Sequence, residues 1–148
     1  MFDPRQPKRS NYLKRFREHV EALRKHLDEG DYVQAAEKVW GALSSFVNAY
    51  SYLEIKAMGE KKQTFAEFFQ QLSIYNKDLR VILDSNFRNI DDFTTKAALF
   101  HVYFYGEREL SLEEFIKPNL EKAYKLLKGV KDTLESLMGS RSNIPVIR

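Results

Sequence analysis

The stretch HLDEGDYVQAAEKVWGALSSF, residues 26–46, decides the fold because it holds the end of one helix and the start of another. Gly30 is suited to end the first helix, since glycine readily adopts the left-handed conformation found just past helix ends. The side chain of Asp31 can then accept a hydrogen bond from a free backbone N–H group in the first turn of the second helix. A junction this short predicts an antiparallel helical hairpin.

Apolar residues recur at helical spacing on both sides of this junction. The segment before it, which we expect Ser10 to cap, carries a narrow apolar stripe made of Leu13, Phe16, Val20, Leu23 and Leu27. The segment after it, residues 31–58, carries a broader apolar face made of Val33, Ala36, Val39, Trp40, Leu43, Val47 and Tyr50. Both segments therefore read as amphipathic helices, with Trp40 as a core residue.

The middle of the chain reads as shorter helices separated by polar breaks. GEKKQ, residues 59–63, is expected to be a break, and the TFAE motif that begins at Thr64 fits a capping box for a helix ending near Tyr75. A short helical turn is expected over residues 78–87, followed by a loop and cap at residues 89–92.

Two further helices complete the chain. We expect one over residues 92–105, ended by Gly106, and a last one that starts at the SLEE capping box of Ser111 and runs to about Met138. Pro118 lies one to two turns into this last helix and has no backbone N–H. It should therefore kink the helix or delay its regular start.

No segment shows the sustained alternation of apolar and polar residues that is typical of a strand. The sequence thus predicts an all-α protein, an up-and-down antiparallel helical bundle of about five helices with the short ones in the middle. We expect a single domain over residues 1–148, with tails at residues 1–9 and 139–148.

The composition fits a globular protein of the cytoplasm. Hydrophobic residues make up 43% of the 148 residues, there is no cysteine, and the formal net charge is +3. The absence of cysteine excludes disulfides and thiolate metal ligands and fits a reducing compartment. No apolar run approaches the roughly 18 residues of a membrane span, so we expect no membrane association.

Motifs for cofactors and metals are absent from the sequence. It has no glycine-rich phosphate cradle, no His-Glu-x-x-His and no Glu-x-x-His pair for a dinuclear site. His19 and His26 lie seven residues apart on one side of the first helix, next to the apolar stripe. Such a pair could bind a metal across a dimer, but we interpret the two as residues at the boundary of the core. We therefore expect no metal and no cofactor.

The segment KAALFHVYFYG, residues 96–106, carries the most reactive combination of side chains. Its histidine and lysine suit acid–base or phosphate chemistry, but the same segment also suits an ordinary buried helix. At about 100° per residue, Lys96 and His101 point about 140° apart, whereas Lys96, Phe100 and Tyr103 lie on one side.

Basic residues gather near the N-terminus. Within residues 1–17 the only acidic residue is Asp3, and the basic ones are Arg5, Lys8, Arg9, Lys14, Arg15 and Arg17. This cluster suits an arm that binds RNA or an acidic partner, and it equally suits a solvated tail and helix face.

Two separated segments resemble one known family. GDYVQAAEKVWGA, residues 30–42, resembles the opening hairpin of the archaeal PaREP family. KAALFHVYFYGERELSLEEF, residues 96–115, resembles the later signature of that family, a Leu-His-x-x-Phe-Tyr-Glu run, with Phe100 in place of the leucine and Gly106 in place of the glutamate. The resemblance covers residues 15–138.

The PaREP family is similar to the wider HEPN superfamily of helical bundles, which implies a homodimer. Many HEPN ribonucleases carry Arg-x-x-x-x-His-x-Tyr, and Lys96, His101 and Tyr103 fall on those positions. The resemblance implies that His101 deprotonates a 2′-hydroxyl while Lys96 stabilises the charged phosphorane, without a metal. Lysine lacks the planar fork of arginine, and Ala97 stands where a polar residue is common, so these departures argue against catalysis.

Three functions are consistent with these features, and we prefer the first. It is a HEPN-like homodimeric binding module for RNA, a nucleotide or a small nucleotidyltransferase, which in some such pairs modifies the tyrosine that corresponds to Tyr103. The second is a metal-independent ribonuclease, a toxin or defence effector, with His101 as base and Lys96 and Arg88 holding phosphate. Arg88 and Asn89 would reach that site only through the fold. The third is an RNA- or ribosome-associated protein that uses the basic N-terminal arm.

Overall fold

The computed structural model describes residues 7–51, 55–106 and 109–139. In chain order the helices of these ranges are α1 (Pro7–Glu29), α2 (Tyr32–Ser51), α3 (Met58–Tyr75), α4 (Asp78–Asn86), α5 (Ile90–Phe104), the π-helical turn η1 (Leu112–Ile116) and α6 (Lys117–Gly139). No strand occurs among them, so the predicted all-α class is confirmed, with six α-helices in place of about five.

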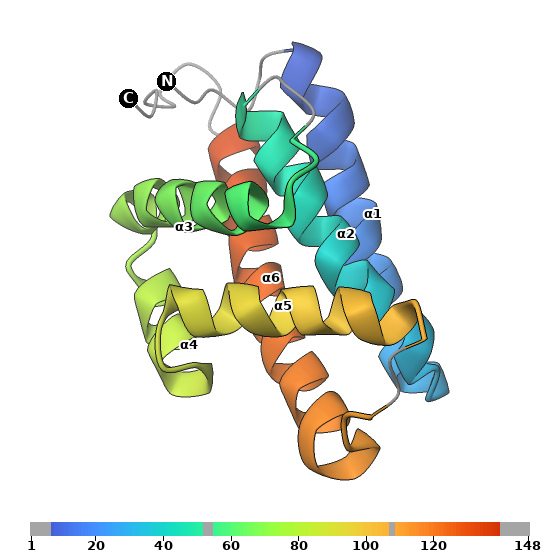
Figure 1. The fold of residues 1–148 in the computed structure, drawn as a ribbon. Helices are drawn as coiled ribbons and strands as arrows, with labels where there is room; N and C mark the ends of the chain where they lie inside the picture. The colour runs from blue at the N-terminus through green and yellow to red at the C-terminus, as the bar shows by residue number, and fades with distance from the viewer. Residues whose placement is uncertain (1–6, 52–54, 107–108, 140–148) are drawn as a thin grey trace.

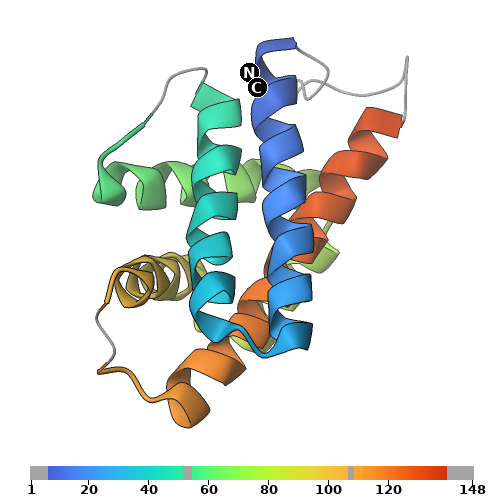
Figure 2. The ribbon, with the colours of Figure 1, turned by 90° about the vertical axis from the view of Figure 1, so that its right-hand side faces the viewer.

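The predicted antiparallel hairpin of α1 and α2 is present, as Figure 2 shows. Gly30 has a φ of 75°, in the left-handed region where glycine is favoured, and Asp31 accepts a hydrogen bond from the backbone N–H of Gln34 at 3.2 Å. Gly41 of α2 lies against the ring of His19 on α1, where a Cβ would come within 2.8 Å of the ring. A small residue at position 41 therefore lets the two helices approach closely.

The remaining helices pack across this hairpin. Figures 1 and 2 show α3 and α5 crossing α2 steeply, with α6 behind them and the short α4 beside α6. One continuous core joins all of them, with large fully buried side chains that include Phe16, Leu23, Leu43, Phe46, Phe65, Phe69, Leu72, Phe93 and Phe100. Burial of these rings and aliphatic chains is the main stabilising force of the fold.

Three helix boundaries differ from the prediction. The first helix begins at Pro7, so Ser10 lies inside it rather than at its cap; proline is favoured in a first helical turn because its missing N–H has no partner there anyway. The second helix ends at Ser51, well before residue 58. Helix α3 then begins at Met58, so GEKKQ and Thr64 are helical, which fits the high helix propensity of lysine, glutamate and glutamine.

The caps around α5 and α6 follow the prediction. Asn89 caps α5 by accepting the backbone N–H of Asp92 at 2.8 Å, and Ser111 accepts the backbone N–H of Glu114 at 3.1 Å. The turn that follows Ser111 is π-helical, with Ile116 N–H bonded to the Ser111 carbonyl at 2.9 Å. This is the delayed regular start expected from Pro118, which cannot donate to the preceding turn.

Candidate functional site

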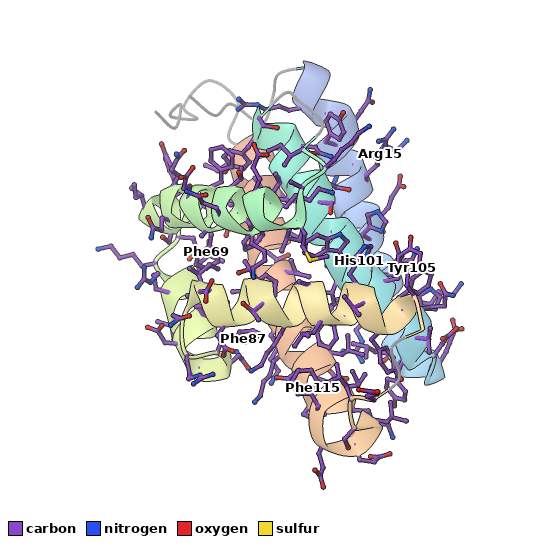
Figure 3. All side chains as sticks on the ribbon, viewed as in Figure 1. Arg15, Phe69, Phe87, His101, Tyr105 and Phe115 are labelled. Carbon is purple, nitrogen blue, oxygen red and sulfur yellow. The ribbon has the colours of Figure 1, made fainter. Side chains whose placement is uncertain are left out.

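His101 lies in an aromatic setting at the carboxyl end of α5. Its half-buried ring is 5.2 Å from the ring of Trp40 on α2 and 5.0 Å from that of Tyr105, as centroid distances (Figure 3). The buried Nδ1 atom has no hydrogen-bond partner in the described part of the chain. Burial, and secondly the charge of Lys61, lower the pKa of His101 below its ordinary value, with Glu37 opposing them. The neutral imidazole is therefore favoured at neutral pH.

Lys96 lies in a different, ionic setting nearer the amino end of α5. Its ammonium is 3.2 Å from a carboxylate oxygen of Asp92 and 5.5 Å from the ring centre of Phe87. Asp92 also accepts the backbone N–H of Arg88 at 3.0 Å. Desolvation alone would raise the pKa of Asp92, but these contacts outweigh it and hold that pKa below its ordinary value.

The structure thus separates the lysine and the histidine of the candidate motif. They leave the helix about 140° apart, as its geometry dictates, and each has its own neighbours. The positive charge that bears on His101 comes from Lys61 of α3, whereas Lys96 is brought together with Arg88. Tyr103 is buried, with only 7% of its surface exposed.

A polar cleft surrounds Lys96 and Arg88, and we call it the Arg88 cleft. It has a volume of about 430 Å³ and is lined by Asp84, Ser85, Asn86, Phe87, Arg88, Asp92, Lys96 and Lys122. A smaller cavity of about 290 Å³ adjoins Arg88 and Asn89 on the other side of Asp92. Asn89 is occupied as the cap of α5, so its contribution there is to position the helix start.

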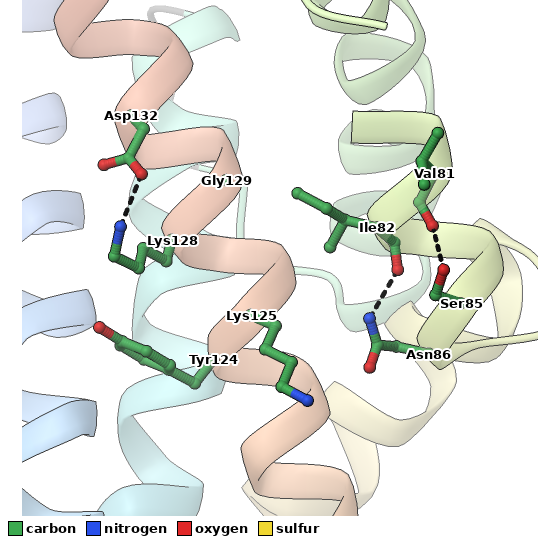
Figure 4. Close-up of a pocket in the computed structure, with 9 residues that line it drawn as sticks. All are labelled: Val81, Ile82, Ser85, Asn86, Tyr124, Lys125, Lys128, Gly129 and Asp132. Carbon is green, nitrogen blue, oxygen red and sulfur yellow. Dashed lines mark hydrogen bonds and ion pairs between the residues drawn. The ribbon is translucent and has the colours of Figure 1, made fainter. Parts of the chain in front are cut away.

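Next to the Arg88 cleft, an apolar groove of about 370 Å³ runs between α4 and α6 (Figure 4). We call it the α4–α6 groove, and its lining residues are Val81, Ile82, Ser85, Asn86, Tyr124, Lys125, Lys128, Gly129 and Asp132. No sequence pattern singled it out, because its two walls come from segments about forty residues apart that only the packing brings together.

The N-terminal basic residues do not form one exposed arm. Arg9 is only 1% exposed, with one guanidinium nitrogen 3.5 Å from the Tyr50 carbonyl, so its assignment to an arm was wrong. Lys14 and Arg15 are exposed on α1, and Arg17 is partly buried. Arg5 and the side chain of Lys8 lie outside the described residues.

The outer face of α5 carries exposed apolar side chains. Leu99, Val102 and Tyr105 are 37%, 38% and 74% exposed, and we call them the α5 strip. Leu99 and Val102 lie one turn apart on α5, and Tyr105 is the residue that caps its carboxyl end. Their exposure was not predicted from the sequence, in which they stand among other aromatic and aliphatic residues.

Within 7–51, 55–106 and 109–139, no three histidine, aspartate or glutamate side chains gather in a way that would hold a metal ion. In the same ranges no helix combines the length and the apolar character needed to cross a bilayer.

The fold and the paired motifs define a helical protein of an archaeal family. The sequence model of the archaeal PaREP1/PaREP8 family matches residues 11–128, and the chain belongs to this family. The match includes residues 30–42 and 96–115, the two segments that carry the resemblance. No curated protein and no solved structure matches the chain.

Proposed function

We propose that this protein is a HEPN-like homodimeric binding module that associates through the α5 strip and does not turn over RNA. The observation that carries the proposal is the exposure of three apolar side chains, Leu99, Val102 and Tyr105, along the carboxyl half of α5 and at its cap. Apolar residues that are exposed together on a helix face typically mark an interaction surface. The archaeal family membership is compatible with this role.

The separate settings of Lys96 and His101 argue against a shared cleavage site. A base and a phosphate-stabilising cation must converge on one scissile phosphate, within hydrogen-bond reach of it. Here the ammonium of Lys96 is engaged by Asp92, and the ring of His101 packs against the ring of Trp40 in a tilted arrangement. Lysine also lacks the bidentate fork that arginine offers to a phosphate.

The runner-up function is a metal-independent ribonuclease, and one observation favours it. The lowered pKa of His101 keeps the ring in the neutral form that a general base requires. In that reaction Lys61, rather than Lys96, would be the nearby cation.

Size-exclusion chromatography with light scattering tests the dimer. The wild-type chain should elute with twice the mass of one chain, and Val102→Asp should weaken association at least about 100-fold, because it buries a carboxylate in an apolar contact. The matched control is Ile74→Asp on α3, where the replaced side chain is 75% exposed and outside the strip. A monomeric wild type, or a dimer unaffected by Val102→Asp, would contradict the proposal.

The partner of the module is proposed to be RNA, a nucleotide or a small nucleotidyltransferase. A transferase that modified Tyr103 would need the end of α5 to open, since that side chain is buried. Mass spectrometry of the chain after incubation with a small nucleotidyltransferase and nucleoside triphosphate tests this modification. Absence of an adduct on Tyr103 would leave binding without modification as the form of the interaction.

A further inference from the structure

The Arg88 cleft and the α4–α6 groove are neighbours that share two lining residues. Ser85 and Asn86, in the last turn of α4, line both cavities. Along α6 the cleft meets Lys122, and the groove begins at Tyr124 and continues to Asp132. A ligand could therefore lie across the end of α4 with one part in each cavity.

The cleft end is cationic. Arg88 comes from the α4–α5 connection, Lys96 from α5 and Lys122 from α6, so three separate elements place positive side chains around one space. Of the two carboxylates present, Asp92 is engaged by Lys96 and by the Arg88 N–H, and Asp84 is exposed.

The groove end is apolar, with a lysine at its edge. Val81 is 63% exposed on the α4 wall, and Ile82 closes on Gly129, where a Cβ would come within 2.9 Å of the isoleucine Cδ1. Figure 4 shows Lys125 extending toward the α4 side, while Lys128 turns up to its ion pair with Asp132 at 2.7 Å. The lysine that remains available at the groove is therefore Lys125.

We propose that this composite site binds an amphiphilic organic phosphate. The phosphate would lie in the Arg88 cleft, where the guanidinium fork of Arg88 and the ammonium of Lys122 match a compact dianion, while the charge of Lys96 is balanced by Asp92. The apolar body would lie in the α4–α6 groove, where removal of aliphatic surface from water supplies affinity. This proposal goes beyond dimerisation, because the α5 strip contributes no residue to either cavity.

Isothermal titration with octyl phosphate, below its micelle concentration, tests the composite site. Inorganic phosphate and octanol each provide one half of the ligand, and each should bind at least about tenfold more weakly than octyl phosphate. Arg88→Gln and Lys122→Gln should lower the affinity at least tenfold by removing charge at the head. Val81→Asp should do so by blocking the tail.

Two matched controls keep the test specific. Lys25→Gln removes a lysine that is exposed on α1, and Ile74→Asp places a carboxylate on an exposed face of α3; neither residue lines the site. Both controls should bind octyl phosphate like the wild type, as should Val102→Asp, which tests the dimer instead. The proposal would be overturned if the folded wild type did not bind octyl phosphate, or if Arg88→Gln and Val81→Asp bound it as tightly as the wild type does.

A second arm separates two sources of this chemistry. Co-sedimentation with vesicles of phosphatidylcholine containing phosphatidic acid should occur if the ligand is a lipid headgroup with its chains. Binding of octyl phosphate without co-sedimentation supports a soluble phosphate ester. Co-sedimentation that Arg88→Gln and Val81→Asp leave unchanged would count against the composite site.

Discussion

Replacement of Asp92 should cost more stability than replacement of any surface carboxylate of a helical ion pair. Its carboxylate accepts both the backbone N–H of Arg88 at 3.0 Å and the ammonium of Lys96 at 3.2 Å, and its side chain is only 10% exposed. Hydrogen bonds to charged groups contribute about 1.5–3 kcal/mol each, so Asp92→Ala should lower the free energy of unfolding by about 2–4 kcal/mol. Asp92→Asn retains an acceptor for the Arg88 N–H and should lose about half of that.

Urea denaturation at pH 7 measures this loss, and the pair Lys128–Asp132 provides the control. Both of its side chains are about half exposed, so Asp132→Ala should cost about 0.5 kcal/mol or less. Equal losses for Asp92→Ala and Asp132→Ala would refute the reasoning that the Asp92 contacts organise the start of α5.

The pH dependence of the same variants gives an independent check. The folded pKa of Asp92 is depressed, so its contribution is fully present above the unfolded pKa of about 3.9 and is lost as pH falls through the folded pKa. The stability difference between the wild type and Asp92→Asn should therefore shrink below about pH 4. A difference that stayed constant down to pH 2 would contradict the assigned role of the carboxylate charge.

Two further predictions concern the histidines. Gly41→Ala should destabilise the chain by about 1–2 kcal/mol, because the overpacking against His19 exceeds the gain in helix propensity. In a His19→Ala background the same change should be neutral or stabilising. If thermal unfolding showed that the effects of the two substitutions simply add, the contact between Gly41 and His19 would be absent. Burial lowers the pKa of His19 and of His101, with Lys38 and Lys61 respectively as second causes, so the unfolded chain binds more protons below about pH 6.5. The free energy of unfolding should consequently fall as pH drops below about 6.5. In urea titrations between pH 7 and 5, His101→Gln should make this fall with pH less steep. An equally steep fall in His101→Gln would show that His101 does not cause it.

Local chemistry explains which parts of the fold could be predicted. Asp31, Asn89 and Ser111 cap their helices through side-chain contacts only three residues away, so the sequence alone contains the whole interaction. The prediction of a break at residues 59–63 was wrong, since these residues lie in α3. Their lysines, glutamate and glutamine have high helix propensity, and one glycine does not prevent a helix. Packing, rather than propensity, decides between those alternatives.

The site was less predictable because its contacts span long separations. The resemblance to the ribonuclease motif implies that Lys96 and His101 act in one active site. The geometry of a helix, by contrast, directs their side chains about 140° apart. Lys61 reaches the surroundings of His101 from α3, and Lys122 joins Lys96 from α6. No spacing rule links residues that lie so far apart in the sequence, in helices that meet only through the tertiary fold.

The central claim is that α5 serves binding rather than RNA cleavage. The most direct measurement is incubation of labelled RNA with the wild type and with His101→Ala, in EDTA, with the fold of each checked by circular dichroism. We predict no cleavage by either protein. Cleavage by the wild type that disappears in His101→Ala would contradict the claim and establish His101 as a catalytic base.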